Sequence, residues 1–71
     1  MKFSKEVLVS LRQDRDYSLG ILSRMLLCRC NLKISRSAIS QWEQGKTCPK
    51  ISSLLALAKV FQVDPAVFFQ E

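Results

Sequence analysis

The chain is dominated by apolar residues at helical spacing. In four stretches, apolar residues recur every three or four positions, as in helices that bury one face against a core. These stretches are residues 4–14, 19–30, 36–44 and 51–61. A fifth, short helix is expected after Asp64, because Asp64 can cap it and Pro65 suits the first helical position. No stretch alternates as a strand would, so the pattern predicts an all-α fold, a compact five-helix bundle.

The apolar positions also predict which side chains form the core. Serines stand where three of the helices should begin, and their hydroxyls can accept from free N–H groups of the first turn. These candidate caps are Ser4, Ser18 and Ser35. The residues expected to be buried are Val7, Leu8, Leu11, Leu22, Met25, Leu26, Ile39, Trp42, Leu54, Leu55, Leu57, Ala58, Phe61 and Phe68.

Residues 35–46 form the most informative stretch. Ile39 and Trp42 share one face of the expected helix, and Gly45 can take the left-handed conformation that ends it. The opposite face carries hydrogen-bonding residues, namely Arg36, Ser37, Ser40, Gln41 and Gln44. Arg and Gln pair bidentately with guanine and adenine edges in the major groove. A solvated helix face is the alternative interpretation of this composition.

Size and charge narrow the class of protein. With 71 residues and a net charge of +5, the chain is expected to be one basic domain, 1–71. Its basic residues cluster around residues 35–46, and Glu43 is the only acidic residue from Arg24 to Lys50. This distribution favours a polyanionic partner over the alternative that the charges only keep the surface soluble.

The remaining composition argues against several other classes. The cysteines, Cys28, Cys30 and Cys48, are odd in number and the chain has no His, so neither a disulfide framework nor a metal site is expected. Reduced thiols predict a cytoplasmic protein. No apolar run reaches the roughly 20 residues of a membrane span. Without a recognisable nucleophile, base or phosphate loop, no enzyme activity or cofactor is expected.

The segment Ile34–Lys46, ISRSAISQWEQGK, resembles the recognition helix of the helix-turn-helix family of phage repressors and Cro proteins, the XRE-like family. The resemblance extends from about Leu8 to Phe68. It implies a transcriptional regulator that binds a palindromic operator in double-stranded DNA as a homodimer. By matching positions, it implies base contacts from Arg36, Ser37, Ser40 and Gln41. It likewise implies phosphate contacts from Ser18, Gln44, Lys46 and Thr47, and a structural ion pair between Arg12 and Glu43.

The chain departs from this family between its second and third helices. Residues 27–33 stand where the family usually has a single glycine, so the connection is lengthened. We expect the second helix to continue for about one turn, with Asn31 in the left-handed conformation and Leu32 folding back onto the helix.

Two further expectations concern partners. Val67 and Phe69 are apolar residues that the core does not require, so they are the predicted dimer interface, which would form in solution or only on DNA. The alternative function is a protein-interaction module, antitoxin-like or adaptor, built on the same scaffold. Salt dependence separates the two functions, because phosphate contacts weaken steeply as salt is added.

Overall fold

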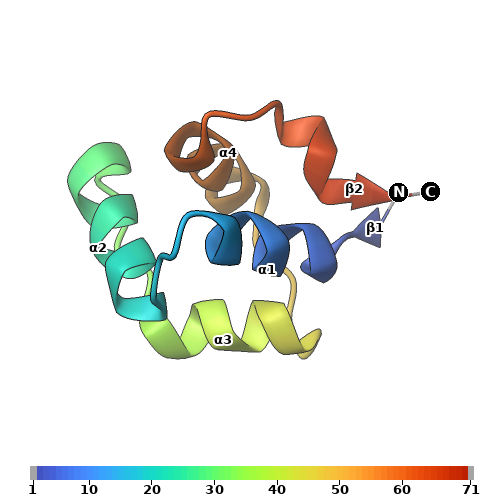
Figure 1. Cartoon of the computed structure of the whole chain (residues 1–71), viewed down its shortest axis with the longest axis horizontal. Coiled ribbons are helices and arrows are strands. Elements are labelled where there is room, and N and C mark those ends of the chain that lie inside the picture. Colours follow the sequence, from blue (N-terminus) through green and yellow to red (C-terminus); the bar gives the residue numbers. More distant parts are fainter. Residues whose placement is uncertain (1, 71) are drawn as a thin grey trace.

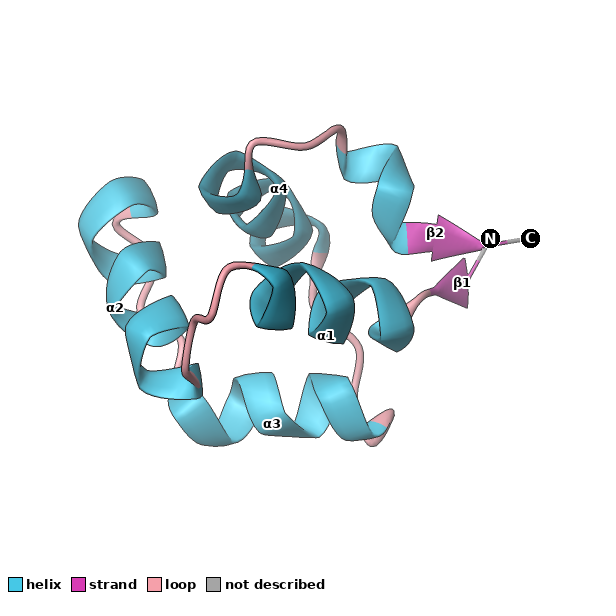
Figure 2. Cartoon of the chain, in the orientation of Figure 1, coloured by secondary structure: helices cyan, strands magenta, loops and turns pink. Residues whose placement is uncertain are grey.

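The structure is a computed structural model that describes residues 2–70. Its four α-helices are α1 (Lys5–Asp14), α2 (Leu19–Cys30), α3 (Arg36–Gln44) and α4 (Ile51–Phe61). A 3-10 turn, η1 (Pro65–Phe68), follows α4, and the two-residue strands β1 (Lys2–Phe3) and β2 (Phe69–Gln70) complete the fold. Figure 1 and Figure 2 show the two strands side by side.

Serine caps begin three of the helices, as predicted. The hydroxyl oxygens of Ser4, Ser18 and Ser35 accept from the N–H groups of Val7, Ile21 and Ala38 at 3.4, 3.1 and 3.1 Å. The C-terminal ends of α2, α3 and α4 are each capped by a residue in the left-handed conformation. These residues are Asn31 (φ 51°), Gly45 (φ 81°) and Gln62 (φ 57°). Short-range signals therefore account for where α1, α2 and α3 begin and for where α2, α3 and α4 end.

The core lies where the helices converge around α1. In Figure 1, α3 runs along the lower edge, α2 stands at the left and α4 lies above. Helix α2 packs against both α3 and α4, and α1 packs against α3. The core side chains are Leu8, Leu22, Leu26, Ile39, Trp42, Leu54, Ala56, Leu57, Ala58, Val60, Phe61 and Phe68. Packing of Tyr17 on Phe61, with ring centroids 6.1 Å apart, brings the α1–α2 turn onto the end of α4.

The predicted five-helix count is wrong. The segment after Asp64 is a single 3-10 turn of four residues, in which the Val67 N–H donates to the Asp64 carbonyl at 3.0 Å. The chain leaves this turn at once, because Phe69 pairs with Phe3 in the antiparallel β1–β2 ladder and the Phe68 carbonyl accepts from the Ser4 N–H at 2.6 Å. Strands of two residues are too short to show alternation, which explains why the sequence pattern missed them.

Leu55 was also predicted incorrectly. It was expected in the core, yet its side chain is 54% exposed. Leu54, Leu57 and Phe61 follow the three- and four-residue spacing of one face, and Leu55 lies about 100° around the helix from Leu54. Leu55 instead lies four residues from Ile51 and from Lys59, and these three residues share the exposed side of α4.

Candidate nucleic-acid interface

Helices α2 and α3 and their connection form a helix-turn-helix unit. Asn31 ends α2 in the left-handed conformation, its N–H donating to the Leu27 carbonyl at 3.0 Å. The next N–H, of Leu32, reaches back to the Leu26 carbonyl at 3.2 Å, and the Leu32 side chain packs against the core. The lengthened connection therefore continues α2 and then folds back, as predicted.

A second contact holds the connection against α2. The Ser23 hydroxyl donates to the Ile34 carbonyl just before α3 begins. A small residue at this position lets the connection approach α2, and its hydroxyl satisfies a carbonyl that would otherwise lack a partner. The placement of α3 is thus determined by contacts at both ends of the connection.

Helix α3 separates its apolar and polar side chains cleanly. Ile39 and Trp42 are buried against the core. The side chains of Arg36, Ser37, Gln41 and Gln44 are exposed, and that of Ser40 is half-buried. The structure therefore brings all four predicted base-contacting residues, together with Gln44, to one outward face.

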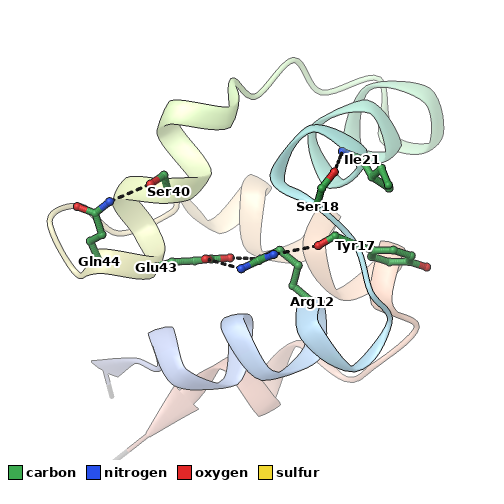
Figure 3. A network of polar contacts seen from close by, with 7 residues as sticks. All are labelled: Arg12, Tyr17, Ser18, Ile21, Ser40, Glu43 and Gln44. Atoms are coloured by element: carbon green, nitrogen blue, oxygen red, sulfur yellow. Dashed lines mark hydrogen bonds and ion pairs between the residues drawn. The ribbon is translucent and has the colours of Figure 1, made fainter.

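Two of these residues are already oriented by each other. The Gln44 Nε2 donates to the Ser40 Oγ at 2.9 Å, one turn earlier along α3 (Figure 3). Ser40 therefore accepts a bond from Gln44 and keeps its own hydroxyl proton for another acceptor. A base edge or a phosphate oxygen can supply that acceptor.

The predicted phosphate-contacting residues lie at both ends of α3. Ser18 lies beside the first turns of α3, where it lines a shallow hollow together with Arg36, Ser37 and Ser40. Its Oγ caps α2 by accepting from Ile21, which leaves its hydroxyl proton free to donate (Figure 3). Lys46 and Thr47 are exposed in the loop after α3. These positions flank the outward face, which is the arrangement expected of residues that hold a backbone on either side of a reading helix.

Arg12 and Glu43 meet in a bidentate ion pair that joins α1 to α3. Arg12 Nε lies 2.6 Å from Glu43 Oε2, and Arg12 NH2 lies 3.1 Å from Oε1. The remaining NH1 donates to the Tyr17 carbonyl at 2.9 Å (Figure 3). With the two side chains only 18% and 12% exposed, this guanidinium fixes α3 and the turn before α2 relative to α1. Glu43 therefore faces the interior of the fold and does not add negative charge to the outward face.

From the sequence alone, Gly20 in the first turn of α2 has no explanation; in the structure it lies beside Arg36. A β-carbon at Gly20 would lie 3.3 Å from Arg36 Cδ, so the Arg36 side chain extends across the first turn of α2. The signal was present in the sequence, because glycine in a first turn lowers helix stability and calls for a reason. Arg36 is the neighbour that a side chain at this position would meet, and because Arg36 is exposed it can move aside.

Lys5 is a second residue that sequence reasoning did not single out. Its side chain lies over Gly45, with Nζ 3.1 Å and Cδ 3.3 Å from where a β-carbon would stand. The ammonium group therefore sits at the carboxyl end of α3, where a cation interacts favourably with the helix dipole. Only the folding of α1 across α3 reveals this placement, because Lys5 and Gly45 are far apart in the sequence.

The charge of this region has one sign. No Asp or Glu occurs from Tyr17 to Trp42, a stretch that contains Arg24, Arg29, Lys33 and Arg36. All four basic side chains are exposed. Three of them, Arg24, Lys33 and Arg36, line one hollow beside the start of α3, so positive charge gathers there.

The residues predicted for a dimer interface differ in exposure. Val67 is 41% exposed, whereas Phe69 is half-buried, lies in β2 and packs against the core. In the C-terminal third of the chain, the apolar side chains with greater exposure belong to α4, namely Ile51 at 66% and Leu55 at 54%. The structure therefore leaves Val67 available to a partner and engages Phe69 largely within the fold.

Comparisons with known proteins agree with this architecture. The family model described as Helix-turn-helix matches residues 29–68, more than half of the chain, including α3, α4 and η1. No curated protein and no solved structure matches the chain. Among residues 2–70, no helix is long and apolar enough to cross a membrane. The match, with the geometry of α2 and α3, shows that the chain belongs to the helix-turn-helix family of the Cro/XRE type.

Proposed function

We propose that this protein is a transcriptional regulator that binds double-stranded DNA sequence-specifically, with α3 in the major groove. One observation carries the proposal. The outward face of α3 consists of hydrogen-bonding side chains with a single charged residue, Arg36, and its acidic residue, Glu43, is turned inward to Arg12. An ordinary solvated helix face would mix acidic and basic residues. A helix face without exposed carboxylates can approach base edges between two rows of phosphates without charge repulsion.

The roles within the site follow from side-chain chemistry. Arg36 favours a guanine and Gln41 an adenine, because each offers two polar atoms that match those base edges. Ser37 and Ser40 add single hydrogen bonds to bases. Ser18, Gln44, Lys46 and Thr47 hold the backbone and set the register of α3. Each bidentate base contact contributes about 1–3 kcal/mol of discrimination against the wrong base.

A homodimer on a palindromic operator completes the proposal. One head of this size reads few base pairs, and two heads related by a two-fold axis would place their α3 helices in successive major grooves about 34 Å apart. Val67 and Phe69 remain the proposed contact residues, with Val67 the more accessible of the two.

Substituting Val67→Asp should leave the melting temperature unchanged and weaken binding to a palindrome more than binding to a half-site. Equal affinity of the variant and the wild type for the palindrome would place the interface elsewhere, with Ile51 and Leu55 next in line.

The direct test of DNA recognition is selection of bound sequences from a random duplex pool at physiological salt. Enrichment of one motif that repeats as a palindrome is the expected result, with log affinity falling linearly as log salt concentration rises. A matched protein carrying Arg36→Ala and Gln41→Ala should fold normally and lose the motif. Recovery of unenriched sequences by the wild type would contradict sequence-specific binding. That outcome would favour the second candidate, a protein-interaction module of the antitoxin or adaptor kind, which would act in the cytoplasm without an operator.

A further inference from the structure

Helix α2 exposes apolar side chains that neither the fold nor DNA binding requires. Its inner face buries Leu22 and Leu26 completely. Its outer face still carries Ile21 and Leu27, each 47% exposed. A surface helix normally carries polar side chains on its outer face, so large apolar side chains exposed there suggest a missing cover. Among residues 2–70, no element covers Ile21 and Leu27.

These side chains line a groove rather than a flat surface. A hollow of about 990 Å³ runs between α2 and the segment that leads into α3. Ile21, Met25, Leu27 and Ile34 supply its apolar lining. A concave apolar surface of this size is typical of a binding site, because a partner can bury its own apolar residues there on more than one side.

The groove also has a consistent charge. Arg24, Lys33 and Arg36 line it, and within the part of the chain that the structure describes no acidic residue does so. A complementary ligand must therefore combine apolar groups for the lining with negative charges for the three cations. A DNA duplex has the charge but presents mainly phosphate and sugar, so it would leave Ile21 and Leu27 facing water. An acidic protein segment has both properties.

We propose that this groove binds an acidic amphipathic helix of another protein, and that such binding excludes DNA. An amphipathic helix lays apolar residues at positions i, i+3, i+4 and i+7 into a groove, and its acidic residues would meet Arg24, Lys33 and Arg36. Arg36 and Ser18 line the groove and belong to the proposed DNA-binding surface as well. The partner helix and an operator therefore compete for the same side chains. The docking stands on the groove alone, whereas the exclusion rests on the proposed DNA-binding function.

Fluorescence anisotropy with a designed probe tests the docking. The probe is a labelled peptide of about 16 residues, long enough to form a helix, with Leu at i, i+3, i+4 and i+7 and Glu at the other exposed positions. One control peptide replaces each Glu with Lys, and another replaces each Leu with Ser. The acidic amphipathic peptide should bind, and both controls should bind about tenfold or more weakly. Lack of binding by the acidic peptide at about 0.1 mM, or equal binding of the lysine peptide, would overturn the proposal.

Two exposed leucines provide matched protein variants. Leu27→Gln removes an apolar side chain from the groove, and Leu55→Gln removes one of similar exposure from α4. Leu27→Gln should weaken peptide binding about tenfold, while Leu55→Gln should change it less than about twofold. Equal effects of the two substitutions would show that the peptide does not use the groove. Sedimentation of the peptide-free protein adds a further check: if Leu27→Gln dissociates a dimer, a second copy of the chain covers the groove and the proposed partner is wrong.

Competition separates the docking from the DNA-binding proposal. Unlabelled acidic peptide should displace a duplex obtained from the random-pool selection, at the concentration at which it occupies the groove. Simultaneous binding of peptide and duplex would overturn the exclusion. If the wild-type protein retains no duplex at all, the proposed function fails, and the anisotropy measurements still decide the docking.

Discussion

Helices α2 and α3 form one helix-turn-helix unit and both bury an apolar face, but they differ in the side chains they expose. Helix α3 buries Ile39 and Trp42, and each of its fully exposed side chains is polar or charged. Helix α2 buries Leu22 and Leu26 and then exposes Ile21 and Leu27 as well. A polar outward face that suits DNA accounts for α3. Nothing in the described residues 2–70 covers the exposed apolar side chains of α2, and this is why we propose a second partner for them.

The largest expected effect tests whether the two faces of α2 differ energetically. Leu26 is fully buried and Leu27 is 47% exposed, although they are neighbours. Leu26→Ala should lower the free energy of unfolding by about 2–5 kcal/mol, because it leaves a cavity in the core. Leu27→Ala should lower it by less than about 1 kcal/mol, since Leu and Ala have similar helix propensities. Urea denaturation measures both values, and similar losses would mean that the outer face of α2 is covered in the free protein.

The next effect tests how α3 is held in place. Arg12→Ala should lower the free energy of unfolding by about 2–3 kcal/mol, because it leaves the mostly buried Glu43 carboxylate unpaired and removes the bond to the Tyr17 carbonyl. Arg15→Ala is the matched control. The exposed Arg15 donates to the Phe61 carbonyl at 2.9 Å and lies 5.4 Å from the centre of its ring, so its loss should cost about 1 kcal/mol. Thermal melts that rank the two variants in the opposite order would contradict a structural role for the ion pair.

A third prediction divides the α3 surface into residues that read bases and residues that hold phosphate. Gln41→Ala should cost about 1–3 kcal/mol of binding free energy at the preferred site and relax base preference at one position. Lys46→Ala should weaken binding to all duplexes alike and reduce the salt slope by about one ion. Titrations of specific and random duplexes at several salt concentrations measure both effects. Equal losses on both duplexes for Gln41→Ala would remove it from the base-reading residues.

The smallest effect links the two helices. Gly20→Ala should raise the free energy of unfolding by up to about 1 kcal/mol, because alanine favours a helix and the exposed Arg36 side chain can move aside. The same movement should reduce DNA affinity a few-fold, with the change confined to the base that Arg36 reads. A variant that is more stable and equally selective would show that the Gly20–Arg36 packing does not position Arg36 for binding.

Local signals were sufficient for most of the fold. The serine caps, the left-handed residues Asn31 and Gly45, and the apolar spacing placed the four α-helices at the bounds observed. The continuation of α2 into the lengthened connection was predicted in the same way. These features depend on hydrogen bonds and side-chain directions within a few residues, which is the range over which a sequence can be interpreted directly.

Features that depend on distant segments were missed or incorrectly predicted. The β1–β2 pair joins the two ends of the chain, and η1 remains one turn because Phe69 continues into that pair. Leu55 was assigned to the core from its apolar character, whereas the position of α2 against α4 decides which face of α4 is covered.

By itself the sequence determined the four α-helices, the buried face of α3 and the set of polar residues on its other face, because helical periodicity assigns a face to every residue once the helix bounds are known. The family resemblance, which extends from about Leu8 to Phe68, also predicted the pairing of Arg12 with Glu43. Only the tertiary structure decided that Gly20 accommodates Arg36, that Lys5 reaches the end of α3, and that Ile21 and Leu27 line a groove. Those relations join residues on different elements, and the packing angles that bring them together arise from the whole core.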